Sequence, residues 1–454
     1  MNQSEIRTAL AVGLLYIVRM LGLFMVLPVL PLVADQYQLN TPLLLGFALG
    51  AYGMTQALLQ IPLGILSDRV GRKPIILGGL MLFVLGSLVA AYAETIYGVI
   101  AGRLLQGCGA IASTLLALVA DLTRIEHRGK AMAIVGISIG GSFGLALILG
   151  PLVNGYFGVG GVFLFCALAG VVGLFVTGLI PTPRVRSHNP DANVNPALVD
   201  SLLHLPDLRR TLVGIFMLHY LLMGSFVILP PLLASTGRIA PDEYHLVYFW
   251  LLLAAFVAMM PFMWLSDRPA YTKLMLLAMI VTFAAASLIF SLAPGFYLLM
   301  VAVMLFFMAF NLLEVILPAL VSKIAPAGRR GTAMGLYSTA QFAGGFAGGA
   351  LVGLMLTWWD FAYAMYANAA FCVVWLVYAA GLSKPGNIRT ITCRLGDPGA
   401  ASTSEVTDAL LSLDGVVDVA LIEQDRLAYV KVNEDVFDIA AFEDLRNRMI
   451  LATN

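Results

Sequence analysis

Long apolar runs, separated by short polar segments, dominate the chain from residue 8 to residue 382. A helix that crosses a bilayer needs about 20 mostly apolar residues. By this criterion the pattern predicts twelve membrane-spanning helices, at 8–33, 43–66, 74–92, 96–121, 131–157, 161–180, 211–234, 244–265, 273–293, 295–322, 332–357 and 361–382. The first run is too long for a cleaved signal peptide and carries Arg19 inside it. We therefore expect an all-α membrane protein over this part of the chain.

The longest polar segment, the Pro-rich stretch 181–210, divides the helices into two sets of six, at 1–180 and 211–383. The two sets share short sequences. Leu66-Ser67-Asp68-Arg69 recurs 199 positions later as 265–268, and Arg128-Gly129-Lys130-Ala131-Met132 resembles 330–334, 202 positions later. Short membrane loops often share basic residues and glycine, but two matches at nearly one offset favour duplicated halves. Duplicated halves suit alternating access, in which one half moves against the other around a central site.

Loop charge predicts the orientation. The five loops after even-numbered helices carry fifteen Lys and Arg residues when Lys273, the first residue of the helix that follows, is included, and the six loops after odd-numbered helices carry one, Arg238. By the positive-inside rule, the even loops and both termini face the cytoplasm. Composition agrees with a membrane class, since 60% of residues are hydrophobic and 11% are charged, against about 25% charged residues in a soluble domain.

Residues 387–454 have a different pattern, and they are acidic. Segments 387–394, 416–422 and 426–432 read as strands, whereas 402–412 and 439–450 read as helices. This βαββα order fits a small α+β ferredoxin-like domain, placed on the cytoplasmic side. The net charge of −5 over residues 384–454 predicts docking on the basic cytoplasmic face of the membrane part. A passive appendage and a dimerisation module are the alternatives.

Eleven residues at 64–74 form the first motif, with Asp68 at the C-terminal end of a helix, where the helix dipole disfavours a carboxylate. Asp121 and Asp267 occupy equivalent positions. Such groups need cationic partners, and Arg69, Arg128 or the helix start near Gly331 are the candidates. A cluster of this kind would act as a cytoplasmic latch that forms in one state and breaks in another; the alternative is a solvated loop whose charges only set the orientation. The proposed latch comprises Gly64, Asp68, Arg69, Gly71, Arg72, Lys73, Asp121 and Arg128.

Three ionisable residues fall within the apolar runs: Arg19, Arg103 and Glu314. Charges at membrane depth are costly, so function is the first hypothesis for each. Glu314 is the carboxylate farthest from a helix end and is the candidate proton carrier; the alternative is a structural pair with Arg19 or another donor. Arg103 is close enough to the periplasmic end for its side chain to reach outward.

Other polar residues in the helices are candidates to line a substrate cavity, although a lone polar group is often only a helix–helix contact. They are Tyr16, Tyr52, Gln56, Gln60, His219, Tyr220, Asn311 and Gln341. Glycines at every fourth position, with Pro151 after them, predict close packing of the fifth helix. The packing residues are Gly140, Gly144, Gly150, Pro151 and Gly155.

Four of these stretches resemble motifs of the major facilitator superfamily. Residues 64–74 resemble its loop 2–3 motif, Leu21-Gly22 with 28–31 its helix 1 antiporter motif, 103–110 its motif B and the glycines of 140–155 its antiporter motif C. The resemblance spans 8–382 and implies a bacterial inner-membrane, proton-coupled antiporter that exports a small amphipathic compound. It also implies that Arg103 takes part in proton transfer and that the fifth helix packs across the halves. After Asp267-Arg268 the second half departs from the loop motif.

The acidic domain resembles heavy-metal-associated domains at 413–416, but the two cysteines of their metal loop are missing. The chain has four cysteines and no CxxC pair, so we expect no metal site, no cofactor and no disulfide framework. No nucleophile elbow or phosphate loop supports an enzyme, and an acidic soluble domain does not favour nucleic acid. A uniporter or symporter, and a sensor that signals through the tail, are the alternatives to an antiporter.

Overall fold

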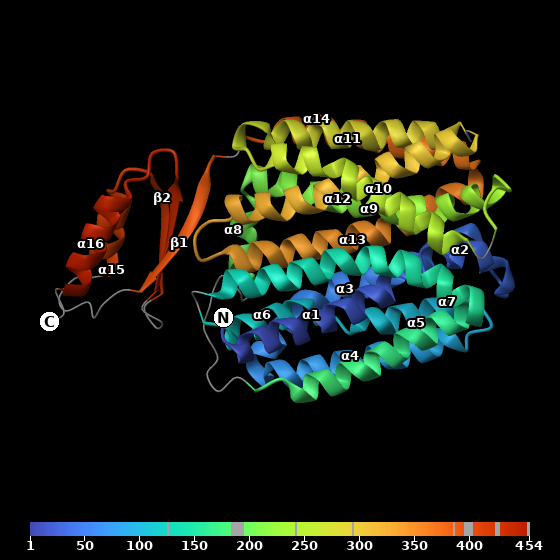
Figure 1. Cartoon of the computed structure of the whole chain (residues 1–454), viewed down its shortest axis with the longest axis horizontal. Helices are drawn as coiled ribbons and strands as arrows, with labels where there is room; N and C mark the ends of the chain where they lie inside the picture. The colour runs from blue at the N-terminus through green and yellow to red at the C-terminus, as the bar shows by residue number, and fades with distance from the viewer. Residues whose placement is uncertain are drawn as a thin grey trace.

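The computed structural model describes residues 1–124, 127–182, 195–240, 243–292, 295–384, 386–394, 403–422 and 427–451. Long helices lie side by side along the long axis, and a small domain lies at one end (Figure 1). We call the end of the helix bundle beside this domain the tail end, and the opposite end the far end. The helices are α1 (Gln3–Phe24), α2 (Leu30–Val33), α3 (Pro42–Val70), α4 (Arg72–Ala91), α5 (Ile96–Cys108), α6 (Ala112–Leu122), α7 (Arg128–Leu179), α8 (Val199–Leu203), α9 (Pro206–Ser235), α10 (Tyr244–Ser266), α11 (Pro269–Ser291), α12 (Phe296–Ile324), α13 (Arg330–Trp358) and α14 (Phe361–Ala380).

Within the described residues, eleven helical segments are long and apolar enough to cross a membrane, and each of the twelve predicted spans overlaps one of them. The largest difference is in the predicted span 8–33, where α1 ends at Phe24 and the separate short helix α2 follows. The numbers differ because α7 is assigned as one helix of 52 residues, although Gly158 inside it has a φ of 66°. This left-handed conformation favours glycine and separates the predicted helices 131–157 and 161–180. One predicted span is in turn divided, into α5 and α6, at Gly109–Ile111.

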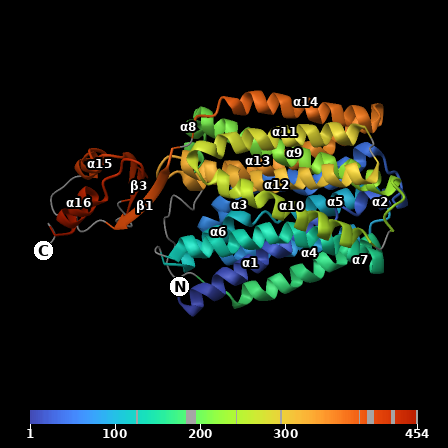
Figure 2. The ribbon, with the colours of Figure 1, turned by 45° about the horizontal axis from the view of Figure 1, so that its top comes forward.

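The first six spans form one half of the bundle and the last six form the other, as two views show (Figures 1 and 2). The predicted linker 181–210 lies partly outside the described residues, at 183–194. Its described part forms the 3-10 turn Pro196–Leu198, the short helix α8 and the start of α9. The N-terminal half therefore ends with α7, and the C-terminal half begins with α9.

At the far end the two halves meet through backbone atoms of α3 and α13. A Cβ atom added to Gly46 would collide with the carbonyl group of Gly349. One added to Gly50 would lie 2.9 Å from the Cα and the carbonyl oxygen of Phe346, closer than real Cβ contacts. These positions lie in the far-end halves of both helices, since α3 begins at Pro42 and α13 ends at Trp358. Small residues allow this approach, as in other helix pairs of membrane proteins.

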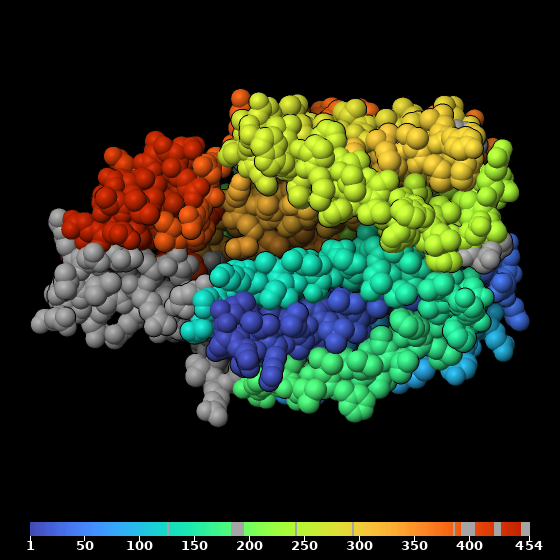
Figure 3. All heavy atoms as spheres, viewed as in Figure 1, coloured from blue at the N-terminus to red at the C-terminus, as the bar shows by residue number. Residues whose placement is uncertain are grey.

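Toward the tail end the halves separate. A Cβ added to Gly136 or Gly140 of α7 would meet no atom within 4 Å, and one added to Gly144 would meet only Leu252 of α10, at 3.9 Å. Figure 3 shows the surface hollowed between α7 (teal) and α10 (yellow-green) on this side. The halves therefore meet at the far end and diverge toward the tail end.

This divergence changes the packing expected of the α7 glycines. The close packing predicted at Gly140 and Gly155 is absent, since neither has an atom within 4 Å of an added Cβ. Gly150 does pack tightly, but against the Met25 carbonyl of its own half. Pro151, one residue on, stays within the helix. At Phe143, next to Gly144, α7 does reach the other half, because the Phe143 ring packs on Phe307 and Phe310 of α12.

The C-terminal domain has the predicted βαββα order. Its elements are β1 (Ile388–Arg394), α15 (Thr403–Leu411), β2 (Val416–Ile422), β3 (Leu427–Asn433) and α16 (Ile439–Leu451). The strands form an antiparallel sheet in the order β1-β3-β2. Val406 and Leu410 of α15 pack on Val430 of β3 and on Phe442 of α16 in one small core. The observed sheet order and helix placement fit a ferredoxin-like α+β domain.

The contact of α3 with α13 predicts the effect of Gly349→Val. The added side chain would force the backbones apart at a cost of about 1–3 kcal/mol, which shifts the equilibrium between closed and open far ends by about 5- to 150-fold. Spin labels at the exposed Gln36 and on Trp358 should report a longer far-end distance by double electron–electron resonance. Gly136→Val is the control: it introduces the same β-branched residue at a position of α7 where an added Cβ meets no atom within 4 Å, and it should leave the far-end distance unchanged. An unchanged distance in Gly349→Val would contradict the seal.

Candidate functional site

One polar cluster lies inside the N-terminal half, between α1 and α3. Arg19 Nη2 donates to the Tyr52 hydroxyl at 3.1 Å and to Gln56 Oε1 at 2.5 Å. Gln56 Nε2 donates in turn to Gln60 Oε1 at 2.8 Å. The four-residue spacing of 52, 56 and 60 places these side chains on one face of α3. All four residues are at most 2% exposed, so the cluster is buried.

A second cluster lies inside the C-terminal half and joins three helices. His219 Nε2 of α9 lies 3.2 Å from Glu314 Oε1 of α12 and 2.9 Å from Gln341 Nε2 of α13. One ring nitrogen thus faces both neighbours. With a proton it forms an ion pair with the Glu314 carboxylate, and without one it accepts a hydrogen bond from the Gln341 amide. The sequence analysis offered a structural pair with Arg19 or another donor as the alternative role of Glu314. In the structure the partner of Glu314 is His219.

Aromatic contacts connect the halves beside these clusters. Successive ring pairs are Phe24–Phe143 at 5.0 Å, Phe143–Phe310 at 5.1 Å and Phe310–His219 at 5.8 Å between centroids. Arg19 precedes Phe24 by five residues, and Glu314 follows Phe310 by four. At about 1.5 Å per residue, both groups lie about 6–8 Å from the aromatic contacts along their helices. Because α1 runs toward the far end and α12 runs away from it, both lie on the tail-end side.

Arg103 belongs to neither cluster. Its side chain is fully buried and does not reach outward. Its guanidinium donates to oxygen atoms on three helices: Gly22 O at 2.5 Å, Leu23 O at 3.2 Å, Ala48 O at 3.4 Å, Leu49 O at 3.5 Å and Gln106 Oε1 at 3.0 Å. Five donors with five acceptors tie α1, α3 and α5 together. The predicted proton-coupling residues are therefore divided among three places.

The remaining cavity candidates lie outside the two clusters. The Tyr16 hydroxyl donates to the Ala112 carbonyl at 2.5 Å, next to the break between α5 and α6. The Tyr220 ring packs edge-on against Phe371 of α14, with centroids 5.4 Å apart. Asn311 lies three residues before Glu314 and is half-buried.

The loop between α3 and α4 holds a charge cluster centred on Arg72. Arg72 Nε lies 3.1 Å from Asp121 Oδ2, and its Nη1 makes an ion pair with Asp68. Arg72, which was not among the expected partners, thus forms an ion pair with both aspartates. The reason is local: Gly71, with a φ of 116°, turns the chain so that Arg72 points back toward the end of α3.

Other residues of the proposed latch contact backbone groups or neighbouring side chains. Arg128 Nε donates to the Ala120 carbonyl at 3.1 Å, and Lys73 Nζ donates to the Gly178 carbonyl at 3.2 Å. A Cβ added to Gly64 would lie 2.9 Å from the Ser113 hydroxyl of α6. All of these partners belong to the N-terminal half.

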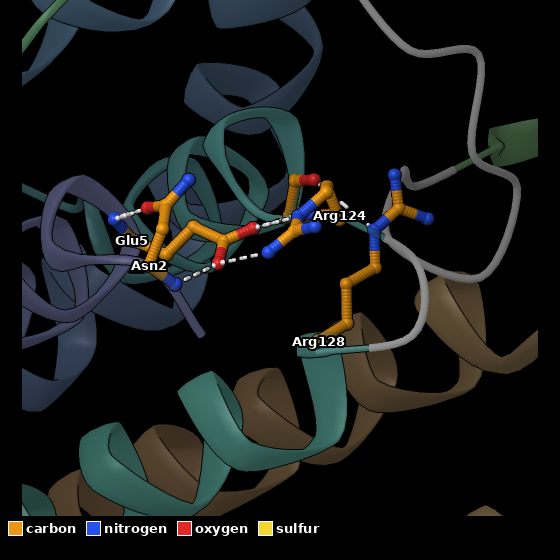
Figure 4. A network of polar contacts seen from close by, with 5 residues as sticks. Asn2, Glu5, Arg124 and Arg128 are labelled. Atoms are coloured by element: carbon orange, nitrogen blue, oxygen red, sulfur yellow. Dashed lines mark hydrogen bonds and ion pairs between the residues drawn. The ribbon is translucent and has the colours of Figure 1, made fainter.

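A network that the sequence analysis missed closes the tail end of the same half (Figure 4). Glu5 Oε1 accepts from Arg124 Nε at 2.8 Å and Oε2 accepts from its Nη2 at 3.2 Å. Glu5 also forms a capping box with Asn2 at the start of α1. The Asn-x-x-Glu spacing is visible in the sequence and identifies the cap. It does not identify Arg124, which is 119 positions away.

The contacts of Arg103 predict the outcome of Arg103→Lys. Lysine keeps the charge but offers three donors from a single nitrogen, so it cannot serve acceptors on three helices. We expect a loss of about 3–5 kcal/mol in the free energy of unfolding, as for other broken buried charge networks. Denaturant unfolding of the purified protein measures it. Arg7→Lys, at an exposed site of α1, is the matched control. Near-native stability of Arg103→Lys would show that these bonds are dispensable.

Comparison with known proteins agrees with this architecture. The model of the Major Facilitator Superfamily matches residues 12–223 and 211–391. The chain is 38% identical over 439 residues to the inner membrane transport protein YajR of Escherichia coli, covering 96% of each chain. It is 25% identical over 362 residues to multidrug resistance protein 2 of Bacillus subtilis, covering 74% of this chain and 86% of the relative.

Among solved structures, a bacterial homolog of the human lysosomal transporter Spinster superposes with a TM-score of 0.67 at 14% identity. The match covers 85% of this chain and 98% of that chain. Two matched halves, a multi-pass helical bundle and a relative along almost the whole length lead to one conclusion. The chain belongs to the Major Facilitator Superfamily and is a membrane transporter, not an enzyme.

Proposed function

We propose that this transporter is a proton-coupled antiporter of the bacterial inner membrane that exports a small amphipathic compound by alternating access. The observation that carries the proposal is the Glu314–His219–Gln341 cluster. It combines a carboxylate and an imidazole at membrane depth, 3.2 Å apart, where a charge without a function is costly. A similarity to a multidrug resistance protein favours an apolar cargo.

Proton exchange would use the single shared nitrogen of His219. When Glu314 passes its proton to His219 Nε2, the resulting imidazolium pairs with the Glu314 carboxylate; when the proton returns to Glu314, Nε2 can accept from the Gln341 amide. Each proton step would thus change which helix α9 is bonded to, α12 or α13. This links protonation to helix position, as coupled transport requires.

The tail end is proposed to face the cytoplasm, with both chain termini on that side. The support is the positive-inside rule, since the basic residues of 69–73, Arg124, 127–130 and 323–330 all lie there. In this arrangement the described state is open toward the cytoplasm and sealed on the periplasmic side by α3 and α13. The Arg72 cluster is formed in this open state. We therefore propose that it holds the α3–α4 loop in the shape that contacts the start of α13 when the tail end closes.

The C-terminal domain is proposed to dock on the α12–α13 loop. Asp418 Oδ2 accepts from the Ala327 backbone N–H at 2.7 Å, and Lys431 Nζ donates to the Lys323 carbonyl at 2.6 Å and to the Ala325 carbonyl. The Tyr429 side chain is buried against Ala327. These bonds join charged side chains to backbone groups. The support for this contact is therefore specific hydrogen bonding, and not the attraction of an acidic domain to a basic face alone. Its position next to the start of α13 suits regulation of the closing movement.

A uniporter or symporter, and a sensor that signals through the C-terminal domain, remain the alternatives. Proton flux in sealed proteoliposomes separates them. We expect addition of cargo to dissipate an imposed pH gradient in the wild type and not in Glu314→Gln, which lacks the titratable group. Protons that move opposite to the cargo indicate antiport, and protons that move with it indicate symport.

The matched control is Glu243→Gln, which neutralises a carboxylate at the far end of the same half and should leave the flux unchanged. Cargo movement that is independent of the gradient, with equal rates in Glu314→Gln, would exclude coupling through this residue. Ligand binding without any flux would favour the sensor.

Docking predicts a local change in hydrogen exchange. Asp418→Asn replaces a charged acceptor of the Ala327 N–H by a weaker, neutral one. A hydrogen bond to a charged group contributes about 1.5–3 kcal/mol, and one between neutral groups about 0.5–1.5 kcal/mol. The difference of about 1–1.5 kcal/mol predicts that exchange at 325–329 accelerates by about 5- to 10-fold. Hydrogen–deuterium exchange followed by mass spectrometry measures it. Glu434→Gln, which alters an exposed carboxylate of the same domain, should leave this peptide unaffected. Equal exchange in wild type and Asp418→Asn would refute the contact.

A further inference from the structure

Arg19 is the buried cation whose hydrogen bonds are incomplete. The residue is 2% exposed, yet Nε and Nη1 have no acceptor among the described residues. Since Nε carries one hydrogen and Nη1 two, three of five N–H donors are unsatisfied. Only Nη2 is bonded, and its partners Tyr52 and Gln56 are neutral.

Arg103, in the same half, shows that this is not simply how the fold treats a buried arginine. Its guanidinium is equally buried and has an acceptor for every donor, supplied mostly by carbonyl groups. Arg103 therefore serves to hold helices together. Arg19, on α1 at the depth of the Glu314 cluster, keeps N–H donors that have no acceptor.

Described carboxylates of the protein do not supply the counter-charge. In the N-terminal half they lie near helix ends, and the three at the tail end have other cations: Glu5 pairs with Arg124, and Asp68 and Asp121 pair with Arg72. Asp35 and Glu94 lie at the far end. Glu314 pairs with His219. A buried guanidinium with spare donors and no carboxylate partner is suited to an anion brought from outside.

We infer that Arg19 is the anion-binding group of the substrate site and that the cargo carries an oxyanion, such as a carboxylate, on an apolar body. The oxyanion accepts from Nε and Nη1 of Arg19, with the Gln60 amide next in the cluster. The apolar body packs toward the aromatic contacts of Phe24, Phe143 and Phe310. This inference rests on the proposed transport function and names its substrate class.

Thermal unfolding of the full-length protein in detergent tests it, with probes of one size. Benzoate, benzenesulfonate and phenyl phosphate are the anions; benzylamine and benzyl alcohol are the cationic and neutral controls. At millimolar concentration each anion should raise the melting temperature of the wild type, and the controls should not. Arg19→Gln should lose this rise, Arg19→Lys should keep part of it, and Arg7→Gln, at an exposed site of the same helix, should keep all of it.

A second readout needs no ligand. Removing a buried charge that lacks a partner relieves a cost, so Arg19→Gln without probe should melt at the wild-type temperature or above it. A lower melting temperature in Arg19→Gln would make Arg19 a structural tie like Arg103 and overturn the inference. So would an equal shift with benzylamine, an anion shift that persists in Arg19→Gln, or the absence of any anion shift in the wild type.

The coupling proposal fails separately. Glu314→Gln should keep the anion shift, because Glu314 belongs to the other half. If the anions stabilise the wild type but proton flux is absent, then antiport is refuted and anion recognition stands.

Discussion

Every ionisable side chain at membrane depth must find a partner, and this constraint accounts for the interior of the protein. Arg103 meets it with five protein acceptors and thereby fixes three helices to one another. Glu314 meets it through one nitrogen of His219, which it shares with Gln341. Arg19 meets it only in part. The degree to which each charge is satisfied separates Arg103, which holds three helices together, from the two residues that we propose respond to a proton or a ligand.

Periodicity and loop charge were enough to predict the architecture. The apolar runs predicted all twelve spans, and the βαββα order of the tail was correct because strand and turn residues there follow local rules. The motif residues also identified the family before any relative was compared.

Partners across the fold were harder to predict. For Asp68 the sequence offered Arg69, Arg128 or the start of α13 as partners, and it did not indicate Arg72, which pairs with Asp68 in the structure. That pairing depends on the turn at Gly71, which a one-dimensional pattern does not describe. Likewise His219 and Glu314 are 95 positions apart, and only the packing of α9 on α12 brings them to 3.2 Å. The glycines of α7 were expected to pack closely, but packing depends on which conformational state the halves adopt.

The glycine contact of α3 with α13 has a consequence for how the molecule moves. Where side chains interdigitate, two helices cannot turn past each other without new rotamers at each step. Here backbone lies directly on backbone at Gly46, Gly50 and Gly349, and the Phe47 and Phe346 rings pack beside them with centroids 5.5 Å apart. Where backbone meets backbone, the two halves can change their angle about this line without new side-chain rotamers. The α3–α13 contact that seals one side of the membrane is therefore also the axis about which that side can open.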